Sequence, residues 1–198
     1  MKRFLLITSL LLTLPALGLA GPRPPVSSGD DNDAVRAGAV EPPVTLLGPG
    51  DRAPDFRFDT VDSTLHLHDV LAQGHALLVF QPDNDQLQAL EAERAELERR
   101  AIFVIAVLDR GERATRTLER RLHLHYLVVS DNRGIIAGQF NVLGATTRRP
   151  EPAWFAIDHG GKIRGLERTR VPDAGYVELV SSTLHLPAPD VIAPSSAH

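Results

Sequence analysis

The sequence predicts an α/β domain in which helices flank a central mixed sheet and a β-hairpin extends the N-terminal side. Two apolar runs, at residues 76–80 and 101–108, have the composition of strands buried on both faces. A polar segment with helical spacing follows each run, so these strands should be parallel, with right-handed crossovers. Two pairs of strand-like segments joined by polar turns add antiparallel strands.

A β-hairpin is predicted to open the domain. Residues 56–58 and 65–67 alternate apolar with polar side chains, which is the period of a strand, and a polar stretch separates them. A short helical turn at 69–73 should follow. Gly74 ends this turn before the first buried strand, at 76–80.

The helix after this strand is predicted at 86–100. Asp85 is its expected N-cap, and Gln88 lies three residues further on, as in a capping box. Glu96 and Arg100 should form an i,i+4 ion pair on the exposed side. The expected buried positions are Leu87, Leu90, Leu97 and Ala101.

Strands and helices alternate in the second half of the domain. The run at 101–108 leads to a very polar helix at 112–122, whose inward side chains should be Ala114, Leu118 and Leu122. The remaining elements are expected as a strand at 126–130, a turn at 131–134, a short helix at 135–140, a hairpin of 153–157 with 162–168, and a closing helix at 173–184.

Residues 1–20 have the pattern of a secretory signal peptide. Lys2 and Arg3 give a charged start, residues 4–14 are apolar, and small residues lead to a cleavage point after Ala20. The apolar run is too short to span a membrane comfortably, which favours a cleaved signal peptide over a membrane anchor. After cleavage, no stable membrane span should remain. We therefore expect export to the periplasm or the extracellular space.

Composition divides the rest of the chain. Residues 21–48 are expected to form a flexible leader rich in proline, glycine and serine, 49–186 the domain, and 187–198 a disordered tail.

The 198 residues are 43% hydrophobic with a net charge of −4, which supports a packed core and argues against nucleic-acid binding. The chain has no cysteine, which excludes disulfides and thiol chemistry.

Four short motifs occur in order along the domain. They are a Gly-x-x-Ala-Pro-x-Phe opening at 50–56, a Leu-His-Asp at 67–69, an Asp-x-x-Gly turn at 131–134, and Phe155-Ala-Ile-Asp158 with Gly161 and Ile163. Together they resemble the thioredoxin-like redoxins, in particular the peroxiredoxin (AhpC/TSA) and membrane-anchored thioredoxin group. The resemblance spans about residues 48–182 and implies a thioredoxin-like fold. By family, the chain would be described as an antioxidant or oxidoreductase.

The active-site residues depart from the peroxiredoxin pattern Pro-x-x-x-Thr-x-x-Cys. Pro82 matches the proline, but the threonine position falls on Gln86 and the peroxidatic cysteine on Ala89. The partner arginine falls on Pro152.

The thioredoxin pattern Cys-x-x-Cys gives the same outcome. Its two cysteines fall on Asp85 and Gln88, and Glu91 matches a glutamate common in the membrane-anchored group. Pro152 then takes the place of the family's cis-proline beside the active-site corner, which favours a cis bond there over the alternative of a trans proline that starts a strand. No nucleophilic sulfur remains under either alignment.

Charged and metal-ligating residues near the corner leave alternatives open. Arg148 and Arg149 precede Pro152 and could attract an acidic partner, although a solvated loop pair is the commoner arrangement. His66 with His68, and His123 with His125, have the i,i+2 spacing that chelates a metal from one face of a strand. Surface histidines at strand edges are ordinary, however, so no metal or other cofactor is predicted.

Two functional hypotheses follow from these residues. The favoured one is an exported binding or scaffolding domain without thiol redox activity, with an envelope protein docking beside Pro152. The alternative is an antioxidant or oxidoreductase of the AhpC/TSA class that acts through a non-thiol or metal site. The ligand, the partner and the oligomeric state leave no signal in the sequence.

Overall fold

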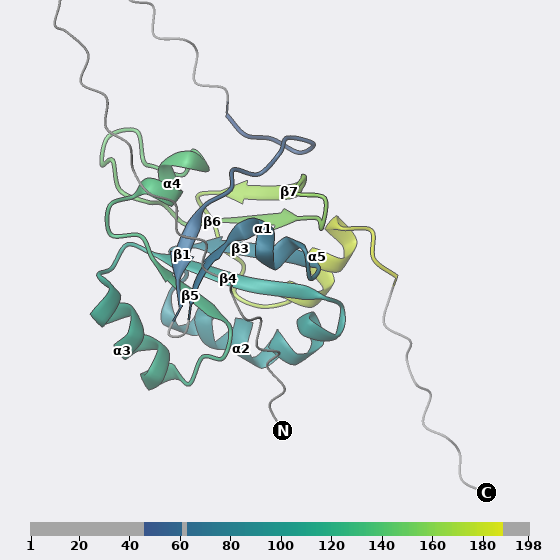
Figure 1. The fold of residues 1–198 in the computed structure, drawn as a ribbon, viewed down its shortest axis with the longest axis horizontal. Coiled ribbons are helices and arrows are strands. Elements are labelled where there is room, and N and C mark those ends of the chain that lie inside the picture. The colour runs from purple at the N-terminus through teal and green to yellow at the C-terminus, as the bar shows by residue number, and fades with distance from the viewer. Residues whose placement is uncertain (1–45, 61–62, 188–198) are drawn as a thin grey trace, which may run out of the picture. The chain divides into compact units, whose positions relative to one another are not determined.

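The computed structural model describes residues 46–60 and 63–187 (Figure 1). The predicted signal peptide, most of the leader and the tail from residue 188 lie outside the described residues. Across the described ranges, no helix has the length and apolar composition needed to cross a membrane. The elements are β1 (Arg57–Asp59), β2 (Thr64–His66), α1 (Leu67–Leu71), β3 (His75–Phe80), α2 (Asn84–Arg99), β4 (Ile102–Leu108), α3 (Glu112–Leu122), β5 (Leu127–Ser130), α4 (Ile135–Gln139), β6 (Ala153–Ile157), β7 (Ile163–Arg168) and α5 (Tyr176–Thr183).

Five strands form the central sheet in the order β5-β4-β3-β6-β7. The pairs β3–β4 and β4–β5 are parallel, whereas β6 pairs antiparallel with both β3 and β7. β1 and β2 form a separate antiparallel hairpin. The predicted mixed sheet with an N-terminal hairpin is confirmed.

The sheet separates two apolar cores because successive side chains of a strand point to opposite faces. On one face, Leu78 and Phe80 of β3 pack with the hairpin, α1 and α4. On the other face, Leu77 and Val79 pack with α2, α3 and α5. All residues at 76–80 are 0% exposed, as the continuous apolar run predicts.

The Gly-x-x-Ala-Pro opening pairs with the turn between β6 and β7. Gly50 N donates to Ile163 O at 2.7 Å, and Ala53 N donates to Gly161 O at 2.9 Å. Gly50 has a φ of 95°, a backbone conformation that favours glycine. The motif thus holds the start of the domain against the closing hairpin.

Two expected side-chain positions are wrong. Ala114, expected to face inward on α3, is exposed, and its neighbour Thr115 is buried instead. The buried residue that precedes Leu118 on α3 is therefore three positions earlier, at Thr115, and not four positions earlier as predicted. Arg100 pairs with Glu96 at 3.0 Å as expected, but only 9% of its side chain is exposed, because it also donates to Ser181 Oγ and to Pro187 O.

Candidate functional site

The corner that follows β3 is short and tightly held. Gln81 leaves the strand with a φ of 49°, and its backbone N donates to Val107 O at 3.0 Å. Pro82 is buried, and α2 begins two residues later at Asn84. The chain therefore turns from strand to helix within three residues.

Asp83, not Asp85, is the N-cap of α2. Asp83 Oδ1 accepts from Gln86 N at 2.9 Å, and Gln86 Oε1 accepts from Asp83 N at 3.0 Å, which completes a capping box. The predicted cap of Asp85 with Gln88 is therefore wrong. Both side chains lie exposed within the first turns of the helix.

The residues at the peroxiredoxin threonine and cysteine positions contribute to packing. Gln86 Nε2 donates to Val171 O at 3.0 Å and to Asp173 Oδ1 at 3.1 Å, so the segment before α5 is tied to the first turn of α2. Ala89 is half-buried and packs against the core shared by α2 and α5. Both positions thus take part in contacts within the protein itself.

Pro152 lies beside the corner, as the alignment implies. The next residue, Ala153, pairs with Phe80 at the end of β3. The described parts of the chain contain no cis peptide bond, so Pro152 is trans and the predicted cis bond is wrong. Glu151 N donates to Val142 O at 2.8 Å, and β6 begins at Ala153, directly after Pro152. The Pro152 side chain is exposed.

Arg148 and Arg149 line a cavity of about 360 Å³ together with Arg133 and Asp109. Asp109 follows β4 and Arg133 follows β5, so the cavity lies at the carboxyl ends of these parallel strands. Its lining does not include Asp85, Gln86 or Gln88, and it does not include Pro152, so the predicted binding residues do not all line one cavity. Sequence reasoning missed Arg133, because its turn was used only as a sign of the fold.

His123 and His125 do not share a strand face. His123 is the C-cap of α3 with a left-handed φ of 53°. His125 instead binds Glu91 on α2, through Nδ1 to Oε1 at 2.9 Å and through its backbone N to Oε2 at 2.8 Å. Burial alone would raise the pKa of Glu91, but hydrogen bonds from His125 and Arg94 outweigh it, and the pKa lies below its ordinary value. The hydrogen bonds between His125 and Glu91 therefore connect α2 to the segment before β5.

His66 and His68 come together, although they do not share a strand. His66 ends β2, and His68 lies in the first turn of α1. With Asp55 they form the single group of three or more potential metal-ligating side chains found within the described residues. The hydrogen bond with Asp55 raises the pKa of His68 above its ordinary value. Sequence reasoning missed Asp55 because it lies inside the opening motif.

The sequence matches the model of a known protein family. The sequence model of the AhpC/TSA family matches residues 49–166, more than half of the chain. The sequence has no significant match among curated proteins.

Several solved structures share the fold. Peroxidoxin BcpB from Mycobacterium tuberculosis has 19% identity and a TM-score of 0.63, and the match covers 70% of this chain and 97% of that chain. PrxQ from Xylella fastidiosa has 18% identity and a TM-score of 0.60, with 71% and 97% covered. A thiol:disulfide interchange protein DsbE from Chlorobium tepidum has 20% identity and a TM-score of 0.56, with 70% and 96% covered. These likenesses show a thioredoxin-like fold, and the family match shows that this cysteine-less chain belongs to the AhpC/TSA family.

Proposed function

We propose that this chain is an exported binding or scaffolding domain that has no thiol redox activity. The observation that carries the proposal is the use of the former reactive positions for packing. Gln86 holds the segment before α5, and Ala89 packs against the core. Neither these residues nor the exposed Asp85 and Gln88 can pass through a sulfenic acid or a disulfide.

Purified protein should reduce neither hydroperoxides in the presence of a dithiol nor the disulfides of insulin. Peroxide reduction in this family needs a thiolate that attacks the O–O bond and polar groups that stabilise the developing charge. Consumption of peroxide and precipitation of insulin measure the two activities, with a cysteine-containing peroxiredoxin and a thioredoxin as positive controls. Catalytic turnover by metal-free protein would contradict the proposal.

The cavity lined by Arg148 and Arg149 supports docking of an acidic segment. Three arginines, Arg133, Arg148 and Arg149, line it against the single carboxylate of Asp109. Such a charge excess attracts a negatively charged partner and orients it on approach. Because the sequence predicts export, the partner is to be sought among cell-envelope proteins.

Arg149→Glu, which reverses a charge in the cavity, should weaken capture of that partner by about tenfold. Pro152→Ala lies outside the cavity lining and should weaken capture because the docked segment extends along the start of β6. Both side chains are exposed, so the melting curve should stay nearly unchanged. Quantitative pull-down from envelope extract, followed by affinity measurement with the captured protein, tests this. Arg170→Glu is a matched control, because Arg170 is also exposed and does not line the cavity. Unchanged capture by both test variants would rule out docking at this surface.

A further inference from the structure

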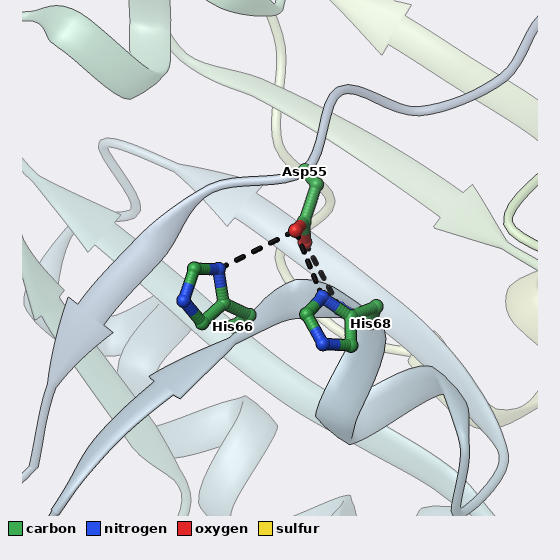
Figure 2. Close-up of side chains that lie close together, drawn as sticks. All are labelled: Asp55, His66 and His68. Carbon is green, nitrogen blue, oxygen red and sulfur yellow. Dashed lines mark hydrogen bonds and ion pairs between the residues drawn. The ribbon is translucent and has the colours of Figure 1, made fainter. Parts of the chain in front are cut away.

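Two imidazoles and one carboxylate converge where the segment before β1 meets the junction of β2 and α1 (Figure 2). One ligand atom from each of Asp55, His66 and His68 lies within 4.8 Å of the other two. Asp55 Oδ2 is 3.4 Å from His66 Nδ1 and 2.8 Å from His68 Nδ1. The three side chains therefore direct nitrogen and oxygen atoms at a common point.

Two hydrogen bonds from backbone N–H groups join the segment before β1 to the start of α1 without involving either imidazole ring. His68 N donates to Asp55 Oδ1 at 3.1 Å, and Leu67 N donates to Phe56 O at 3.0 Å. The approach of the two segments is thus set by the fold.

Asp69 supplies an outer carboxylate for this cluster. Its Oδ1 lies 3.4 Å from His68 Nε2, the ring nitrogen that points away from Asp55 Oδ2. Its Oδ2 accepts from His66 N at 2.8 Å. Histidine ligands of metals commonly donate their second ring N–H to a carboxylate, which fixes the orientation of the ring.

The spacing of the ligand atoms suits a small divalent ion. A metal held at about 2.0–2.2 Å by nitrogen and oxygen ligands places those ligands roughly 3–3.5 Å apart. The 3.4 Å distance from Asp55 Oδ2 to His66 Nδ1 lies within that range, and the 2.8 Å distance to His68 Nδ1, which is a hydrogen bond here, lies just below it. The side chains of Asp55, His66 and His68 are 46%, 41% and 64% exposed, so an ion can reach them from water.

We propose that Asp55, His66 and His68 bind one divalent transition-metal ion, with Zn²⁺ as the reference ion. Imidazole and carboxylate ligands without thiolate suit Zn²⁺, Cu²⁺ and Ni²⁺, whereas Mg²⁺ and Ca²⁺ are bound mainly by oxygen. Three protein ligands leave at least one coordination position for water or for a group from a partner. The site shares no residue with the arginine-lined cavity and does not depend on the docking of a partner there.

Calorimetric titration of the untagged full chain with Zn²⁺ at neutral pH tests the proposal. One equivalent should bind, and saturating Zn²⁺ should raise the melting temperature because the ion binds only the folded state. His66→Ala and His68→Ala should each abolish that rise and weaken binding by more than tenfold. Asp69→Asn removes the charge of the outer carboxylate but keeps an oxygen that can accept from His66 N, and it should weaken binding by about tenfold.

The double variant His123→Ala/His125→Ala is the matched control, because it removes the other histidine pair and should bind Zn²⁺ as the unaltered chain does. Electron paramagnetic resonance of the Cu²⁺-loaded protein gives a second measurement, since coupling to imidazole nitrogen should disappear in the double variant His66→Ala/His68→Ala. Stoichiometric binding that survives this last double variant, or the absence of stoichiometric binding by the unaltered chain, would overturn the proposal.

Discussion

Replacing Phe140 with alanine should lower the free energy of unfolding by about 3–5 kcal/mol. Phe140 is 0% exposed, and its ring centroid lies 5.6 Å from that of Phe80, 5.1 Å from that of Phe155 and 6.0 Å from that of Phe56. These partners belong to β3, to β6 and to the segment before β1, so one ring at the end of α4 joins three parts of the core. Strands that are hydrogen-bonded on both sides cannot close around the lost volume, and a cavity remains.

Denaturant unfolding measures this effect as a lower midpoint at an unchanged slope. Ile135→Ala is the matched control, because Ile135 belongs to the same short helix but is 58% exposed. Its effect should stay within about 0.5 kcal/mol. A loss below about 1 kcal/mol for Phe140→Ala would mean that the core relaxes into the space, contrary to the packing argued from the four rings.

The strands of the central sheet were predictable because burial on both faces leaves a continuous apolar run. Residues 76–80 and 101–108 show this run, and β3 and β4 match them to within one residue at each end. The place of Phe140 in the core was not predictable. A helix of five residues is too short to show a period, and its partner rings are distant in sequence.

The candidate site shows the same limit of local patterns. Asp83 and Asp85 both have a glutamine three residues further on, so each satisfies the capping-box pattern equally well. The contacts of Gln86 with Val171 and Asp173 favour the earlier start, and these contacts exist only in the folded chain. Asp55 and Asp69 likewise lie within motifs that indicate the fold. Their approach to His66 and His68 follows from how the segment before β1 meets α1.

Replacing Asp131 with alanine should lower the free energy of unfolding by about 2–4 kcal/mol. Asp131 is 5% exposed and follows β5. Its Oδ1 accepts from Ile135 N at 2.8 Å and its Oδ2 accepts from Ala137 N at 2.9 Å. The N-cap of α4 is Gly134, which has no side chain that could accept a hydrogen bond. Asp131, three residues before Gly134, takes over this role and accepts from the backbone N–H groups at the start of the helix. Without the carboxylate, the buried N–H of Ala137 loses its partner, and α4 holds Phe140 less firmly in the core.

Asp109→Ala is the matched control for this substitution, because Asp109 follows β4 as Asp131 follows β5 but is only half-buried. The control should unfold close to the unaltered chain, within about 0.5 kcal/mol. Asp131→Asn keeps one acceptor oxygen and should fall between alanine and aspartate. Hydrogen exchange of the α4 amides gives the local measurement, because exchange there should speed up more than in β3 when the helix start loses its acceptor. If the two alanine variants have equal unfolding midpoints, then the start of α4 is held by its apolar contacts alone and not by Asp131.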